Sequence, residues 1–119
     1  MKIKNICILI LTTIFLSGCG INDHIEKANE MFGDQHFKTA IALIELHKIR
    51  EGQYPETLTD LKYLGDWDKI IFNSVSYKKL DDGYELDLTS NLVKNAAALE
   101  YPDEFWKGLG LKKSNLKKE

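Results

Sequence analysis

The hydrophobic residues of this chain change their spacing near Gly65, and this change constrains the fold more than any other feature. Before Gly52 they recur at helical spacing along FKTAIALIELHKI. After Gly65 they alternate with polar residues in two runs separated by Asp-Asp-Gly. A helical period and a strand period belong to different elements. The sequence therefore predicts an α+β domain in which a long helix packs on a small antiparallel sheet.

The expected core joins one side of the helix to one face of the sheet. The residues assigned to it are Phe37, Ala40, Ile41 and Ile44 on the helix and Val75, Tyr77, Leu86 and Leu88 on the sheet. We expect the helix to run from Asn22 or Asp23, which are favourable N-caps, to Glu51 before Gly52. The Gly-Asp pair at 33–34 predicts either a kink or two helices that meet there.

The hairpin should be closed by a two-residue turn, Asp82-Gly83, because an even loop places the apolar residues of both strands on one face. This turn pairs Lys79 with Leu86 and Tyr77 with Leu88. Before the hairpin, Thr57 is expected to cap a short helix that carries Leu58, Leu61 and Leu64.

The remainder of the chain is less regular. Residues 96–101 fit either a third strand or a helix. The sequence YPDEFW indicates a turn that places Phe105 and Trp106 in the core. The basic sequence KKSNLKKE, from about residue 112, is expected to be a solvated tail.

An apolar run of eleven residues, Ile6 to Leu16, stands near the start of the chain behind Lys2 and Lys4. At about 1.5 Å per residue it would span roughly half of a ~30 Å hydrocarbon core. A charged start followed by a short apolar run is typical of a signal peptide and not of a transmembrane helix.

The run ends in LSGC, Leu16 to Cys19, which resembles the lipobox of bacterial lipoproteins. The resemblance implies that the thiol of Cys19 receives a diacylglycerol and that cleavage follows Gly18. Residues 1–18 would then be the signal peptide, 19–22 a lipidated tether and 23–119 one domain. Two or more acyl chains hold a protein stably on a membrane where one is marginal. The alternative is an ordinary secretory leader with a chance cysteine.

The same resemblance predicts the location. We expect a protein of the cell envelope, lipid-anchored to a bacterial membrane. In a Gram-negative source, Gly20 in place of Asp after the cysteine favours the periplasmic side of the outer membrane.

Removal of residues 1–18 leaves 101 residues, enough for one domain, and a formal net charge of about −4. This mild acidity, with no basic aromatic motif, argues against nucleic acid as a partner. Cys7 leaves with the leader, so Cys19 would be the only cysteine of the mature chain. We therefore expect neither an intramolecular disulfide nor a cysteine-based zinc site.

Two stretches, TAIALIELHKIREGQYPETLTDL and DDGYELDLTS, resemble the globular part of type IV pilin-like proteins, especially the major pseudopilins of type II secretion. The resemblance covers about residues 37–90 and implies a long helix laid against an antiparallel sheet. Departures are clear: a lipobox replaces the prepilin cleavage site, so the apolar segment is discarded and cannot drive polymerisation. Only GDWD around Trp67 stands where pseudopilins carry Asp-Pro-Trp-Gly, and their calcium loop has no counterpart.

No pattern of catalytic residues is recognisable, and we expect a protein that is not an enzyme and holds no cofactor or metal. His36 and His47 would stand about 16 Å apart on a continuous helix. His47 and Glu51 have the spacing of helical metal ligands but lack a third ligand. The acidic pairs at 66/68, 81/82 and 103/104 fall in predicted turns, where such residues bond their own backbone.

A second row of apolar residues lies opposite the predicted core face of the helix. It contains Leu43 and Leu46 and, closer to the tether, Ile25, Ala28 and Phe32. Either the segment around Trp106 covers this row, or the row binds another envelope protein or a second copy. We predict the second outcome for Ile25, Ala28 and Phe32. The alternative function is a lipoprotein that binds a small ligand or calcium.

Overall fold

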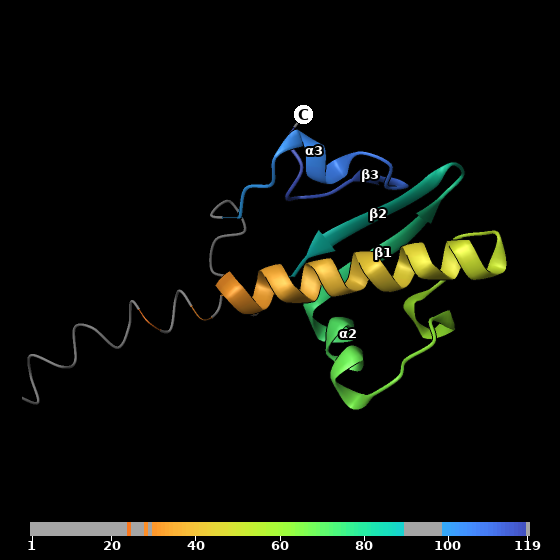
Figure 1. Cartoon of the computed structure of the whole chain (residues 1–119), viewed down its shortest axis with the longest axis horizontal. Coiled ribbons are helices and arrows are strands. Elements are labelled where there is room, and N and C mark those ends of the chain that lie inside the picture. Colours follow the sequence, from red (N-terminus) through yellow and green to blue (C-terminus); the bar gives the residue numbers. More distant parts are fainter. Residues whose placement is uncertain (1–23, 25–27, 29, 90–98, 119) are drawn as a thin grey trace, which may run out of the picture.

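A computed structural model describes residues 24, 28, 30–89 and 99–118 of the protein (Figure 1). The predicted class is confirmed: a helix packs on a small sheet. The elements in chain order are α1 (30–51), the 3-10 helices η1 (Leu58–Asp60) and η2 (Asp66–Ile70), α2 (Ile71–Ser74), β1 (Val75–Leu80), β2 (Gly83–Leu88), α3 (Asp103–Trp106) and β3 (Leu111–Lys113). The sheet has the order β1-β2-β3. The prediction of an antiparallel sheet holds for β1 and β2 but is wrong for the whole sheet, which is mixed because β3 runs parallel to β2.

Helix α1 is continuous from residue 30 to residue 51, and residues 24 and 28 are also helical. The rest of the expected helix start lies outside the described residues. The alternative of two helices that meet at 33–34 is wrong. Asp34 forms an ion pair with Lys38 one turn later, at 3.0 Å, which supports the helix at this point. The helix ends as predicted at Gly52, which has a φ of +79° and donates its N–H to the Lys48 carbonyl at 2.9 Å.

The hairpin has the predicted faces but not the predicted register. Tyr77 pairs with Leu86, and Lys79 pairs with Tyr84, around a turn formed by Asp81 and Asp82. The expected Asp82-Gly83 turn shifts the pairing by two residues, and a shift of two returns every side chain to the same face. The turn prediction was wrong because Gly83 is required inside β2 and not in the turn.

Gly83 is required by a close backbone approach. A Cβ placed on it would lie 2.1 Å from the Gly110 carbonyl oxygen, just before β3. That carbonyl accepts the N–H of Tyr84 at 2.9 Å and so begins the parallel pairing of β2 with β3. Only glycine at position 83 lets the two backbones come this close.

The third strand is Leu111–Lys113 and not the segment 96–101. Residues 96–98 lie outside the described residues, and Leu99 to Tyr101 is irregular. The solvated tail was also a wrong prediction, since residues 112–113 belong to β3 and Leu116 is buried. Asn115 explains why: its side-chain amide exchanges two 2.9 Å hydrogen bonds with the Leu88 backbone and acts as an extra sheet pair.

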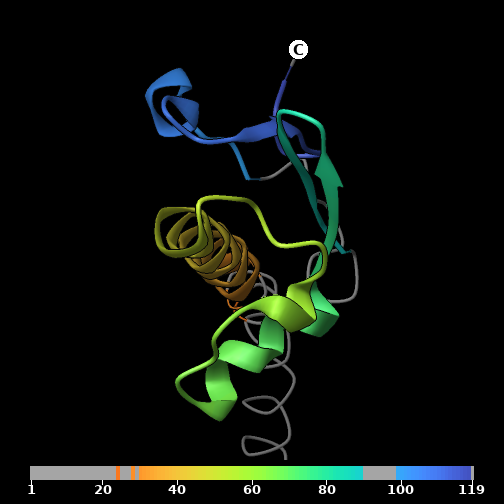
Figure 2. The ribbon, with the colours of Figure 1, turned by 90° about the vertical axis from the view of Figure 1, so that its right-hand side faces the viewer.

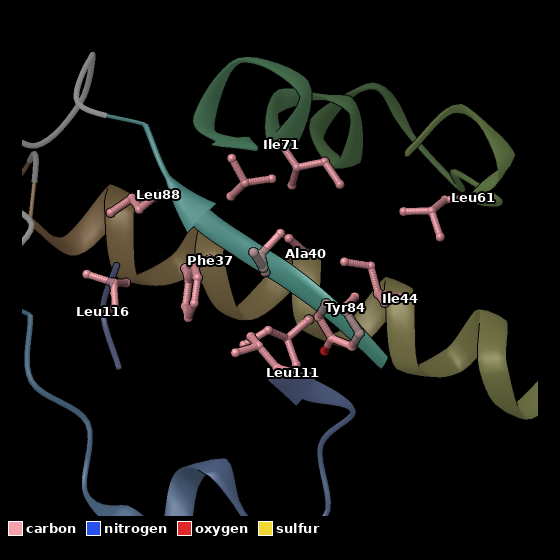
Figure 3. Packing of buried hydrophobic residues seen from close by; sticks show 12 residues of the cluster. Phe37, Ala40, Ile44, Leu61, Ile71, Tyr84, Leu88, Leu111 and Leu116 are labelled. Atoms are coloured by element: carbon pink, nitrogen blue, oxygen red, sulfur yellow. The ribbon is translucent and has the colours of Figure 1, made fainter. Parts of the chain in front are cut away.

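The core lies between α1 and the sheet, as predicted. Figure 3 shows side chains from α1 facing those of β2, with Leu61, α2 and the C-terminal segment closing the edges. Its buried members are Phe37, Ala40, Ile41, Ile44, Leu61, Ile71, Val75, Tyr84, Leu86, Leu88, Leu111 and Leu116. Tyr77 is only partly buried because its ring sits at the rim and its hydroxyl donates to the Pro55 carbonyl at 2.5 Å.

The short helix predicted to carry Leu58, Leu61 and Leu64 is a single 3-10 turn, η1. Asp60 reaches back to accept the N–H of Thr57 at 3.1 Å, so Thr57 occupies the expected capping position. Leu58 and Leu61 pack on the core, whereas Leu64 lies beyond the turn and is exposed.

Phe105 and Trp106 do pack against the core. They are carried by the short helix α3, which follows Pro102.

Candidate functional site

One side of α1 carries a row of exposed apolar side chains. Viewed along the helix in Figure 2, the sheet lies on one side of α1 and no described segment passes over the opposite side. We call this side the outward face and define it by Ala28, Met31, Phe32, Leu46 and Ile49. Four of these side chains are 39–77% exposed, with Met31 at 73% and Ile49 at 77%, and Ala28 is half-buried. Exposed apolar rows of this kind mark contact sites more often than scattered single residues do.

The predicted partner-binding residues fall at the tether end of this face. Phe32 is half exposed, and Ala28 and Phe32 line a shallow groove of about 360 Å³ together with Met31, Asp34 and Gln35. Ile25 lies outside the described residues. The sequence analysis missed Met31 and Ile49, which lie toward one edge of the row on a helical wheel.

The C-terminal segment packs on a different side of α1. Tyr101 stacks on Phe37 with ring centroids 5.9 Å apart, and Trp106 meets the same ring edge-on at 6.3 Å. The Tyr101 hydroxyl also donates to Asp34 at 2.7 Å. These contacts lie beside the core, so Phe32 and Leu46 stay exposed. The expectation that this segment covers the second apolar row is therefore wrong for Leu46.

A carboxylate of α1 holds the start of β3 in place. Oε1 of Glu45 accepts hydrogen bonds from the Tyr84 hydroxyl and the Gly110 N–H, both at 2.9 Å, and Oε2 accepts one from the Tyr54 hydroxyl at 3.2 Å. Burial, followed by the charge of Glu45, raises the pKa of Tyr84 well above its ordinary value, and the pKa of Tyr54 is raised for the same reasons. Both phenols thus remain neutral donors at physiological pH. The cluster joins three elements and offers no activated nucleophile.

Two of these tyrosines belong to a larger aromatic group. The ring centroids of Tyr54 and Tyr84 are 5.0 Å apart, and those of Tyr77 and Tyr84 are 5.8 Å apart. Burial, with a smaller contribution from Glu56, raises the pKa of Tyr77 to about 12. This group was not predicted, because its members come from the loop after α1 and from both strands of the hairpin.

His36 and Ser74 form a buried polar pair. Nδ1 of His36 lies 2.8 Å from the Ser74 hydroxyl oxygen, and that hydroxyl donates to the Ile70 carbonyl at 3.0 Å. The serine proton is thereby used, so the imidazole donates through Nδ1. Burial lowers the pKa of His36 below its ordinary value of 6.5. Ser74 is 1% exposed, which leaves no path for a substrate to its hydroxyl.

His47 and Glu51 line an open groove of about 370 Å³ at the end of α1. The groove also contains Arg50, Glu56 and Lys62, so charges of both signs alternate around it. Within the described part of the chain, no three His, Cys, Asp or Glu side chains gather closely enough to hold a metal ion.

The prediction that the acidic pairs lie in turns is confirmed for one pair and wrong for two, which lie in the 3-10 helix η2 and at the start of α3. Asp81 and Asp82 form the hairpin turn. Asp68 accepts the N–H of Leu64 at 3.1 Å, and Asp103 and Glu104 open α3. The other contacts of these pairs are surface ion pairs, with Asp66 on Lys69, Asp82 on Lys112 and Glu104 on Lys107.

A second apolar feature lies away from α1. Leu64 and Trp67, in the loop between η1 and η2 and in η2 itself, are 93% and 82% exposed. They are two single side chains with charged residues between and beside them, and they do not form a continuous row.

No protein-family model matches this chain, and no curated protein or solved structure matches it either. Among residues 30–89 and 99–118, none of the helices has both the length and the apolar character needed to cross a bilayer. Inferences about function therefore rest on the sequence and on the geometry described above.

Proposed function

We propose that this protein is a membrane-anchored lipoprotein of the bacterial cell envelope that acts as a non-enzymatic interaction module. The lipid chains on Cys19 hold it at the membrane, and the outward face of α1 binds another envelope protein or a second copy of this chain. The observation that carries the proposal is the row of exposed apolar side chains on that face, above all Met31, Phe32 and Ile49.

The row is costly to leave in water. Burying one large apolar side chain is worth about 1.5–3 kcal/mol, so three such residues exposed on one helix represent several kcal/mol of unused contact energy. Persistent exposure of Met31, Phe32 and Ile49 thus supports a surface that is covered in the working state.

The position of the row also supports the proposal. Cys19 lies eleven residues before residue 30, where the continuous description of α1 begins. Phe32 and Met31 would therefore stand close to the membrane, where other envelope proteins are concentrated. A lipid anchor confines the chain to that surface and raises the effective concentration of any partner there.

We further propose that the domain is pilin-like and that its place is in a secretion or pilus-type assembly. The support is the resemblance around the Gly-x-Tyr-Pro sequence and the arrangement of one helix against a hairpin. The competing proposal of a small-ligand or calcium-binding lipoprotein has weaker support. The groove beside His47 is open and mixed in charge, and the described residues hold no cluster of metal ligands.

Site-specific photo-crosslinking in intact cells tests the interaction. A photoreactive residue at Phe32 should capture a defined protein, identified by mass spectrometry, and the same residue at exposed Leu64 serves as the control. Equal capture at the two positions, or capture only of lipid at Phe32, would overturn the proposed face.

Metabolic labelling with palmitate tests the anchor separately. The wild-type chain should incorporate label, and Cys19→Ser should abolish incorporation and release or misprocess the protein. An unlabelled wild type whose mature mass matches an unmodified polypeptide would refute the lipoprotein proposal.

A further inference from the structure

We propose that the outward face of α1 pairs with the same face of a second copy of this chain, as two parallel helices in register. The inference deepens the proposed function and rests on it in one respect, namely that both copies are anchored in the same membrane. The partner of the docking face is then the protein itself.

The first observation is the spacing of the exposed row. Seven positions of α1 follow one another in alternating steps of four and three residues, and we call them the seam: Ala28, Phe32, Gln35, Thr39, Ala42, Leu46 and Ile49. None of the seven is buried. Ile21 and Ile25 continue the same spacing in the sequence. A repeat of 3.5 residues is the pattern by which two helices pack side by side along their length.

The outward face is narrow for a lipid surface even with Met31 beside the seam, because Gln35 and Thr39 lie between its two apolar ends. A helix that lies in a bilayer interface needs a broad apolar face, whereas a strict row two positions wide is the form used for contact with one other helix. Charged side chains flank the seam: Lys38 on one edge and Arg50 on the other, both exposed. A second helix therefore fits this face better than a membrane does.

The polar positions at the centre favour a second copy. In a parallel pair in register, Gln35 meets Gln35 and Thr39 meets Thr39, so amide and hydroxyl groups satisfy one another. A shift of one heptad would place Gln35 against Ala28 or Ala42. Gln35 and Thr39 are two neighbouring polar levels inside the seam, and polar residues at such positions specify register at a cost in stability.

The antiparallel alternative is disfavoured by charge. Matching Gln35 of one copy with Thr39 of the other in opposite directions would bring the Lys38 residues of the two copies to the same edge, offset by two residues or about 3 Å along the axis. Like charges so placed destabilise a helix pair. Anchoring works in the same direction, since both chains leave the membrane at Cys19 and start their helices from the same side.

The length of the seam predicts a weak pair in solution. From Ala28 to Ile49 the helix rises about 32 Å, or three heptads, which is the lower limit for a stable coiled coil. Confinement to a membrane compensates, because two tethered chains meet at a much higher effective concentration. We therefore expect pairing in the membrane and mostly monomers once the chain is diluted in detergent.

Disulfide crosslinking of the full lipidated chain in its membrane tests the inference. Acylated Cys19 offers no free thiol, so Leu46→Cys introduces the only reactive cysteine of the mature chain. Mild oxidation should convert Leu46→Cys into a dimer of twice the mass. The matched control is Leu64→Cys, another exposed leucine outside the seam, which should stay monomeric. Absence of a Leu46→Cys dimer, or equal dimer formation by the control, would overturn the inference.

Two further measurements test the relative direction of the two helices and the surface through which they pair. The first is the expression of Leu46→Cys together with a tagged Ala28→Cys chain. A parallel pair gives disulfides that join position 46 of two Leu46→Cys chains. An excess of disulfides that join position 46 of one chain to position 28 of the tagged chain would overturn the parallel arrangement. Thr39→Lys places a charge in the seam and should cause loss of the Leu46→Cys dimer with no change in the urea midpoint of unfolding, since Thr39 lies outside the core.

The outcome is separable from that of the proposed function. Capture of a different protein by a photo-crosslinker at Phe32, without any self-linked dimer, would keep the interaction module and overturn the second copy as its partner. Failure of palmitate labelling, with a Leu46→Cys dimer that is retained when Cys19 is also replaced by Ser, would overturn the anchor and keep the pairing of the seam.

Discussion

Replacement of Glu45 by alanine should destabilise the domain strongly although the residue lies outside the apolar core. The carboxylate accepts two 2.9 Å hydrogen bonds, one from fully buried Tyr84 and one from the Gly110 N–H, and a longer one from Tyr54. A buried donor left without a partner costs about 1–3 kcal/mol. Two such donors, at a site that is half open to water, place the expected loss at about 2–4 kcal/mol of unfolding free energy.

The series that isolates this effect has three members. Glu45→Gln keeps an acceptor oxygen but loses the charge, and charge-assisted hydrogen bonds are roughly twice as strong as neutral ones, so we expect a loss of about 1 kcal/mol. Glu51→Ala removes an exposed carboxylate of the same helix and should stay within about 0.5 kcal/mol of wild type. Urea unfolding followed by tryptophan fluorescence on the Cys19→Ser chain, which carries no lipid, gives all three values.

The series can refute the reasoning in two ways. If Glu45→Ala costs no more than Glu51→Ala, the three hydrogen bonds do not hold β3 in place. If Glu45→Gln costs as much as Glu45→Ala, negative charge and not the acceptor geometry is what matters at this position.

Three further perturbations have outcomes fixed by burial, close contact and charge. Ile44→Ala, in the core, should cost about 2–5 kcal/mol in urea unfolding, whereas Ile49→Ala on the outward face should stay within about 0.5 kcal/mol. Gly83→Ala places a methyl group 2.1 Å from the Gly110 carbonyl oxygen and should cost about 1–3 kcal/mol, while Gly65→Ala, which meets nothing within 4 Å, should be tolerated. Burial lowers the pKa of His36, so its contribution to stability is complete above pH 6.5 and declines as the pH falls below that value.

Each of these three expectations has an outcome that would contradict it. Equal losses for Ile44→Ala and Ile49→Ala would mean that the core is not where the helix meets the sheet. A neutral Gly83→Ala would contradict the close approach of β2 to the start of β3. The last comparison is the decrease in the urea midpoint of unfolding between pH 7.5 and pH 5.0. If this decrease is the same in wild type and His36→Gln, the buried imidazole does not contribute to the loss of stability in acid.

The faces of the elements could be predicted from the sequence because they depend only on period. Tyr77, Leu86 and Leu88 lie on the core face under any even register, so the alternation fixed their direction although the turn was misplaced by one residue. Gly52 likewise predicted the end of α1, because a glycine directly after a helical pattern can adopt the positive φ that commonly ends a helix.

Contacts between distant segments could not be predicted in this way. β3 has three residues, and it is held by the Gly110 carbonyl and by Asn115, whose partners lie about 26 residues or more away in sequence. The pair of His36 and Ser74 spans 38 residues, and no local pattern marks it. Such contacts are set by how the elements pack and not by the order of residues within one of them.

The outward face was predicted in part. Phe32 and Ala28 were identified because they lie opposite the core on a helical wheel. Their exposure depends on where the C-terminal segment packs, and that is decided by the stacking of Tyr101 on Phe37 and not by any signal near Phe32.

When the chain is in its own membrane, we expect protein to cover the outward face of α1. The most direct measurement is the rate at which maleimide labels Met31→Cys in native membranes and after reconstitution at about one chain per vesicle, with Leu64→Cys as the reference. Met31 is 73% exposed in the isolated chain and Leu64 is 93% exposed. Met31→Cys should be labelled slowly in native membranes and fast after dilution, whereas Leu64→Cys should be labelled fast in both. Equally fast labelling of Met31→Cys in both preparations would contradict this expectation.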